Sequence, residues 1–284
     1  MIVNGYKTKA SVMRALKDRG HKFTGLLAAP TSNPKIAKNM KEGIMTAPLH
    51  LAPASVSGFQ VCAQRSPGCE AACLHTAGNP AYMAQKFASR NDKTRAYFEN
   101  RPLFMALLVF QIAALEKKAK AAKMEPGIRL NATSDIPWES VAFEMNGKKF
   151  ANVMQAFPNV QFYDYTKITK RALAWASGKK ANGTPWPSNY HLTFSKTENN
   201  DSAVSQVLEA GGNVAIVFDA IPESMVNSVG TLRPRDDSPI GSYPVILGDE
   251  HDFRPIDPRG CIVGLKAKGD AKKDESGFVV RIGI

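Results

Sequence analysis

The chain has 284 residues, of which 44% are hydrophobic, 22% charged and 8% aromatic. This composition excludes a disordered chain, a collagen and a coiled coil, and the length suffices for a large core. Lys and Arg number 37 against 25 Asp and Glu, so the net charge is +12 and polyanions are candidate partners. A solvated surface is the more ordinary explanation of this charge, because the basic residues are spread along the chain.

Residues 1–43 are polar and mixed, with a helical pattern over Ala10–Lys17, and we expect an N-terminal extension there. From residue 44 short apolar runs alternate with helical patterns. The predicted strands are Ile44–Leu51, Gly127–Ala132, Val160–Tyr165, Tyr190–Phe194, Asn213–Phe218, Pro244–Leu247, Cys261–Leu265 and Phe278–Ile282. The predicted helices are Pro80–Lys123, Ser140–Ala156, Thr169–Ser177 and Asp201–Ala210.

Apolar runs that alternate with helices are typical of a parallel sheet with crossover connections. Eight runs over about 240 residues fit a (β/α)₈ barrel. We therefore expect residues 44–284 to form one TIM-like α/β barrel, irregular or incomplete after residue 220, where Pro and Gly are frequent. A doubly wound open sheet is the alternative, but Gly211-Gly212 precedes a predicted strand and no glycine-rich phosphate loop follows one.

The sequence predicts a protein that neither spans nor contacts a membrane. The longest apolar run, Leu103–Leu115, is shorter than the roughly 20 residues of a membrane span. The first residues also lack the apolar stretch of a signal peptide. We therefore expect a cytoplasmic protein.

Polar side chains follow the predicted strands, where the active sites of barrel enzymes lie. We expect cofactor contacts from Asn131, Ser134 and Ser195. We expect substrate binding or proton transfer from Asp135, Asp164, Tyr165, Lys167, Lys196, Glu198 and Lys268. Asn, Ser and Asp also favour turns, which accounts for part of this set. With Lys266, the lysines predict a cationic pocket for a small anionic substrate.

Three of the four cysteines, Cys62, Cys69 and Cys73, lie within 12 positions on the loop after the first predicted strand. Such a cluster in a reducing compartment indicates metal or redox chemistry rather than a disulfide framework. Pro67-Gly68 provides a turn, and a helical turn that starts at Cys69 would place two sulfurs on one face. Cys261 lies in an apolar run and is expected to be a small buried residue.

Three thiolates suit a [4Fe-4S] cluster with one open iron site, and they also suit zinc. A zinc site would use His75 as its fourth ligand, and free or redox-active thiols are a third alternative. His50 on the first strand could also reach the same end of the barrel, although a hydrogen-bonded core histidine is commoner.

A three-cysteine loop after the first barrel strand resembles the radical S-adenosylmethionine superfamily. The cysteine spacing, together with Asn131–Asp135 and Phe162–Lys167, is more similar to a phage-encoded group of the mycobacteriophage gene-product-88 type, over roughly residues 44–270. The resemblance implies the barrel, a cluster on the three cysteines and residence in the host cytoplasm. The cysteine gaps differ from those of the radical enzymes, and Asn131–Asp135 replaces their glycine-rich motif, so we expect no cleavage of S-adenosylmethionine.

Two functions from different classes remain open at this point. The first is a redox-active iron–sulfur barrel protein, which could also be an enzyme of the oxidoreductase or radical type. The second is a zinc-containing nucleic-acid-binding protein, in which the cysteine segment is structural and the net charge of +12 provides the binding.

Overall fold

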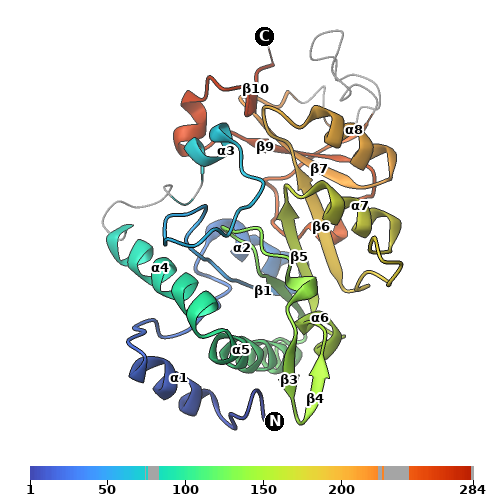
Figure 1. Cartoon of the computed structure of the whole chain (residues 1–284). Coiled ribbons are helices and arrows are strands. Elements are labelled where there is room, and N and C mark those ends of the chain that lie inside the picture. Colours follow the sequence, from blue (N-terminus) through green and yellow to red (C-terminus); the bar gives the residue numbers. More distant parts are fainter. Residues whose placement is uncertain (74, 76–82, 223–225, 227–242, 283–284) are drawn as a thin grey trace. The chain divides into compact units, whose positions relative to one another are not determined.

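The computed structural model describes residues 1–73, 75, 83–222, 226 and 243–282, and it shows a mixed α/β fold (Figure 1). Its chain divides into two compact units. Unit 1 comprises residues 1–62 and 78–163, and unit 2 comprises residues 63–77 and 164–284. The predicted division at residue 43 remains a prediction.

Most strands belong to one largely parallel eight-stranded sheet, in the order β1-β2-β5-β6-β7-β9-β8, with β10 paired to β7. The bounds of these strands are β1 Ile44–Pro48, β2 Glu125–Arg129, β5 Gln161–Thr166, β6 Tyr190–Ser195, β7 Asn213–Phe218, β8 Val245–Leu247, β9 Ile262–Lys266 and β10 Val279–Val280. All eight predicted strands are therefore present. The strand β7 has the predicted bounds, and the others have shifted ends. Among the described strands no pairing joins β1 to β8, so a closed barrel remains a prediction.

The described helices connect and cover these strands. They are α1 Lys9–Asp18, α2 Pro34–Ala37, η1 Lys38–Glu42, α3 Pro67–Ala71, α4 Met83–Glu99, α5 Arg101–Ala121, η4 Trp138–Ser140, α6 Val153–Ala156, α7 Thr169–Ser177, α8 Asp201–Glu209, η7 Arg254–Ile256 and η8 Gly269–Lys273. In unit 1, α5 packs on β1 and β2, and both α1 and α4 pack on α5. In unit 2, α7 contacts β6, and α8 contacts β6 and β7.

The helical pattern predicted over Pro80–Lys123 corresponds to two helices rather than one. Residues 80–82 lie outside the described residues, and the rest forms α4 and α5, which meet at an angle of 117°. Pro102 at the start of α5 explains the break, because a proline ring fits the first turn of a helix but not its interior. Within the described chain no single helix is long and apolar enough to cross a membrane, and only the bent pair formed by these two helices meets the criteria of length and composition.

The helix predicted over Ser140–Ala156 is wrong. Its centre is an antiparallel hairpin of β3 (Phe143–Met145) and β4 (Lys148–Phe150). Asn146 and Gly147 form the turn with φ angles of 52° and 74°, the left-handed pair that two-residue hairpin turns require. Phe143 stacks on Phe150 across the strands, with ring centroids 5.6 Å apart.

Replacing Gly147 by Ala is expected to lower the free energy of unfolding by about 1 kcal/mol, because a Cβ atom is unfavourable at positive φ. Urea denaturation followed by circular dichroism measures this loss. Gly147→Asn is the matched control, since Asn tolerates the left-handed region, and it should lose less. Equal losses for the two variants would show that the backbone conformation of the turn is not what limits stability.

Candidate functional site

The helix α3 carries Cys69, and Cys73 follows it. Ser66 caps the helix by accepting a hydrogen bond from the Cys69 N–H at 3.2 Å, and Pro67 occupies the first turn. The helix thus begins before Cys69 and ends at Ala71, which corrects the expected turn that starts at Cys69. The Cys73 N–H donates to the Glu70 carbonyl at 3.3 Å, so Cys73 still closes a turn at the end of the helix.

Glu198 fixes α3 in unit 2. Its two carboxylate oxygens accept hydrogen bonds from the Ser66 hydroxyl at 2.6 Å and from the Gly68 N–H at 2.8 Å. Partial burial by itself would raise the pKa of Glu198, but these hydrogen bonds outweigh it and hold the pKa below the ordinary value. Glu198 is therefore ionised where it holds the helix.

Gly68 is enclosed at this position. A Cβ atom there would lie 2.9 Å from both the Glu198 carboxylate and Cβ of Phe278, and still closer to the Ser276 hydroxyl. A small hydrophobic cluster completes the surroundings of α3, and its buried members are Ala72, Ala267, Ala271 and Val279. Glu198 follows the end of β6 and Ala267 follows the end of β9, while β10 pairs with the last residues of β7, so α3 lies at the carboxyl side of the unit 2 strands.

Cys62 belongs to unit 1 and lies among the loops after β1 and β2. Its sulfur accepts a hydrogen bond from the Ala54 N–H at 3.4 Å and lies 4.0 Å from the Thr133 carbonyl oxygen. The loops are joined further by the Asp135 N–H, which donates to the Val61 carbonyl at 2.8 Å. The backbone of predicted site residue Asp135 thus holds the loop that presents Cys62.

Asn131 organises the loop after β2. Its side-chain oxygen Oδ1 accepts hydrogen bonds from the Ser134 hydroxyl, the Ile136 N–H and the Trp138 indole at 2.8, 2.9 and 3.0 Å. Its side-chain nitrogen Nδ2 donates to the Ile136 carbonyl at 2.9 Å. Asn131 and Ser134 are both buried, and these contacts give them a structural role in addition to the predicted cofactor role, which remains a prediction.

The predicted groups on β5 point to different faces. Asp164 is fully buried and accepts a hydrogen bond from the Tyr190 hydroxyl at 2.8 Å, and Arg171 of α7 donates to the same hydroxyl at 3.0 Å. Tyr165, the next residue, packs instead with Cys261 in a separate apolar cluster. The two predicted site residues therefore do not converge, and Lys167 follows the strand.

Two of the predicted cationic residues are paired with carboxylates. The Lys196 ammonium, which is 8% exposed, lies 2.7 Å from Asp201 and donates to the Thr197 carbonyl at 2.9 Å. The Lys268 ammonium lies 2.6 Å from Asp249, whose other oxygen accepts from the Lys266 N–H at 2.9 Å. These acids offset the positive charge expected near the strand ends. Ser195 ends β6, and its carbonyl accepts from the Asn200 side chain at 3.0 Å.

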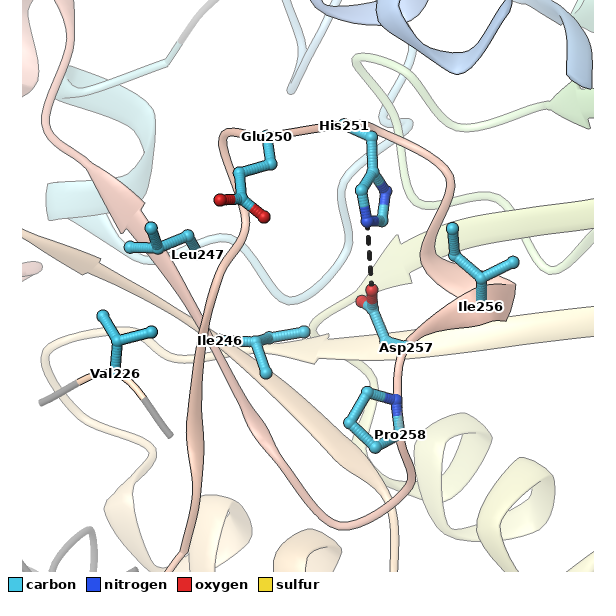
Figure 2. Close-up of a pocket in the computed structure, with 8 residues that line it drawn as sticks. All are labelled: Val226, Ile246, Leu247, Glu250, His251, Ile256, Asp257 and Pro258. Carbon is cyan, nitrogen blue, oxygen red and sulfur yellow. Dashed lines mark ion pairs between the residues drawn. The ribbon is translucent and has the colours of Figure 1, made fainter. Parts of the chain in front are cut away.

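A second polar group, which the sequence analysis did not identify, lies between β8 and β9. Arg254 is fully buried and is placed 3.1 Å from Asp257, while its other nitrogen donates to Nδ1 of His251 at 2.9 Å. Because arginine can only donate, Nδ1 accepts and the ring proton lies on Nε2, 3.8 Å from Asp257 (Figure 2). Both ring nitrogens face protein groups, so this histidine is a structural clamp rather than a free base.

His251 and Asp257 border a pocket of about 270 Å³. Glu250 and the His251–Asp257 pair supply its polar lining, and the rest of the lining is apolar (Figure 2). The spacing of His251, Arg254 and Asp257 by three residues each was the only sequence signal for this group.

Among the described residues, no three His, Cys, Asp or Glu side chains form a group that could hold a metal ion. Cys62 belongs to unit 1, whereas Cys69 and Cys73 belong to unit 2. None of the four cysteines forms a disulfide, and Cys261 alone is buried. Burial, followed by the nearby Asp257 carboxylate, raises the pKa of Cys261 to about 12, so it is a protonated thiol at neutral pH.

Alkylation is expected to distinguish these thiols. Native, reduced and metal-free protein treated with iodoacetamide at pH 8 should be modified at Cys62, Cys69 and Cys73, which are part-exposed, and Cys261 should react only after denaturation. Peptide mass spectrometry locates the modified residues. Rapid modification of Cys261 in the native protein would contradict its buried position.

His191 makes unit 2 sensitive to acid. Burial, followed by the charges of Arg254 and Arg259, lowers its pKa to about 3. Between pH 6.5 and 3 the unfolded chain binds a proton that the folded chain does not, so stability falls as the pH is lowered through this window, by at most about 1.4 kcal/mol per pH unit. Denaturation at a series of pH values should show this slope, and His191→Phe should reduce it. An unchanged slope in the variant would assign the acid sensitivity to other groups.

Comparison with known proteins gives a single family. A family model described as Gene product 88 matches residues 25–282, which include both units and every predicted site residue. No curated protein and no solved structure matches the chain. The match confirms the family resemblance deduced from the cysteine segment and the strand ends, whereas similarity to the radical enzymes and an iron–sulfur cluster remain predictions.

Proposed function

The chain belongs to the gene product 88 family, and we propose that it is an iron–sulfur protein whose [4Fe-4S] cluster is held by Cys62, Cys69 and Cys73. The observation that carries the proposal is the fixed position of α3. A five-residue helix has little stability of its own, yet Glu198 and the enclosed Gly68 anchor it at the carboxyl side of parallel strands.

The donor set fits a cluster. Iron–sulfur clusters are bound by thiolates, and these three thiols are reduced and part-exposed, whereas the buried Cys261 is protonated. Bound there, the cluster would supply one-electron redox chemistry and an iron that no cysteine of this set ligates. The protein's own part is to present the thiols, to keep Glu198 ionised beneath α3 and to exclude Cys261.

Cys69 follows Cys62 by seven residues, so their Cα atoms lie at most about 25 Å apart, and the proposal requires the loop between them to bring the sulfurs together. We further propose that the largely parallel sheet closes into a barrel like that of the radical enzymes, and that the protein does not cleave S-adenosylmethionine.

Anaerobic reconstitution with iron and sulfide tests the proposal. We expect a brown protein with about four iron and four sulfide per chain and a broad absorption band at about 400 nm. Replacing any one of Cys62, Cys69 and Cys73 by Ala should abolish or strongly reduce the band, whereas the matched control Cys261→Ala should retain it.

Glu198→Gln probes the anchor rather than the ligands. The amide is uncharged and keeps a single acceptor oxygen, so its hydrogen bonds to Ser66 and Gly68 are weaker than those of the carboxylate, and the cluster should be released faster during exposure to air. The control is Lys268→Gln, which removes the ion pair with Asp249 after another strand, and it should release the cluster at the rate of the wild type. A colourless protein that binds one zinc, or a band that survives the loss of Cys69, would reject the proposal.

A further inference from the structure

The positive charge of the chain is confined to unit 1. This unit holds 21 Lys and Arg against nine Asp and Glu, a net charge of +12, whereas unit 2 holds 16 of each and is neutral. Along the sequence the excess lies in residues 1–163, because residues 63–77, the part of unit 2 that interrupts unit 1, hold one Arg and one Glu. Solvated surfaces ordinarily mix both signs of charge, as unit 2 does, so the excess in unit 1 calls for a specific explanation.

The helix α1 concentrates this charge on its exposed side. Lys9, Arg14 and Lys17 are exposed and form no ion pair with a described residue, while Val12 and Leu16 are buried. Its first turn contains no acid, so Lys9 lies at the positive end of the helix dipole, where a cation is unfavourable. The placement of Lys9 therefore does not serve the stability of the helix.

A second group of cations lies in the last turns of α5, the helix on which α1 packs. Lys117, Lys118 and Lys120 are exposed there, next to a single acid, Glu116. Lys118 and Lys120 lie at the negative end of the dipole, where cations are favourable.

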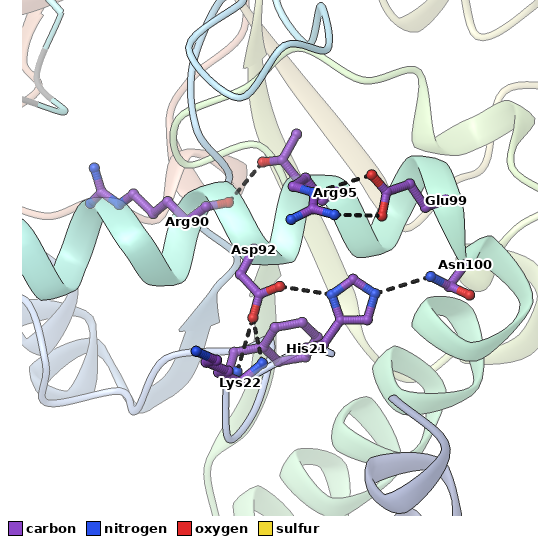
Figure 3. A network of polar contacts seen from close by, with 9 residues as sticks. His21, Lys22, Arg90, Asp92, Arg95, Glu99 and Asn100 are labelled. Atoms are coloured by element: carbon purple, nitrogen blue, oxygen red, sulfur yellow. Dashed lines mark hydrogen bonds and ion pairs between the residues drawn. The ribbon is translucent and has the colours of Figure 1, made fainter. Parts of the chain in front are cut away.

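Hydrogen bonds fix the chain that follows α1, so the cations are carried on a rigid element. His21 contacts Asp92 of α4 at 2.7 Å and Asn100 at 3.0 Å, and the Lys22 N–H donates to the same carboxylate at 2.6 Å (Figure 3). Preorganised cations lose little conformational entropy when a ligand binds.

We propose that unit 1 binds the phosphodiester backbone of a nucleic acid, with α1 and the last turns of α5 supplying the cations. Exposed ammonium and guanidinium groups without ion pairs attract phosphates and release condensed counterions, which requires no base-specific contact. The proposal concerns unit 1 and does not depend on the cluster in the proposed function.

Two other polyanionic partners fit the described surface less well. A helix that binds an anionic membrane needs an exposed apolar face, whereas Val12 and Leu16 of α1 are buried and the helix packs on α5. A protein interface usually contains aromatic anchors, but the exposed large hydrophobic residues among those described in unit 1 are aliphatic or Met.

Fluorescence anisotropy of the full-length chain with labelled 20-base-pair duplexes tests the proposal. The wild type should bind DNA or RNA with a dissociation constant of about 1–100 μM at physiological salt, and log K should fall linearly with log salt concentration. Parallel titrations with duplex DNA, duplex RNA and single strands identify which nucleic acid the protein binds.

The variants map the surface. The triple change Lys9→Gln, Arg14→Gln and Lys17→Gln should weaken binding about tenfold or more and lower the salt slope by up to about three, and the change of Lys117, Lys118 and Lys120 to Gln should act similarly. The matched control replaces Lys170, Lys272 and Lys273 of unit 2, which are also exposed, and should change binding less than about twofold.

Circular dichroism confirms that each variant is folded. The proposal is overturned if wild-type binding is absent or insensitive to salt. It is equally overturned if the control weakens binding as much as the α1 variant, or if polyglutamate or phosphatidylserine vesicles bind more tightly than the duplexes.

Discussion

The carboxylate of Glu198 connects two parts of the sequence on which the candidate site depends. It accepts hydrogen bonds from Ser66 and Gly68, 132 and 130 residues earlier in the chain. A helix as short as α3 cannot hold its orientation alone, because helix nucleation is unfavourable and only a few backbone hydrogen bonds offset it. The direction in which Cys69 and Cys73 are presented is therefore set by tertiary contacts, which are the carboxylate, the enclosed glycine and the small apolar cluster beneath the helix.

Strands with strong local signals could be predicted from the sequence. The run Asn213–Phe218 is continuously apolar after Asn213 and follows a glycine pair, and β7 has the predicted bounds. Helical periodicity gave wrong predictions where turn-forming residues determine the structure. The Asn146-Gly147 pair is a strong hairpin signal that outweighs the apolar spacing around it, and Pro102 ends one helical direction and begins another.

The surroundings of the predicted site residues could not be read from the sequence. Their identity and their position after strands were visible, but Lys196 meets Asp201 and Asp164 meets Tyr190 through side-chain directions that only the folded chain defines. The clamp of His251, Arg254 and Asp257 lacks a regular element of its own apart from the short η7. The partition of charge, by contrast, can be counted from the sequence, because residues 1–163 carry the whole net charge of +12 and residues 164–284 are neutral.

The dependence of α3 on late parts of the chain has a consequence for biosynthesis. Phe278 and Val279, which lie against Gly68 and Ala72, are translated more than 200 residues after the helix itself. At about 5–20 residues per second, a ribosome needs roughly 10–40 s to add that length. Throughout this interval the nascent chain carries its cysteine segment without the surface that seats it, so the thiols are open to oxidants and to metal-delivery factors before the fold encloses the helix.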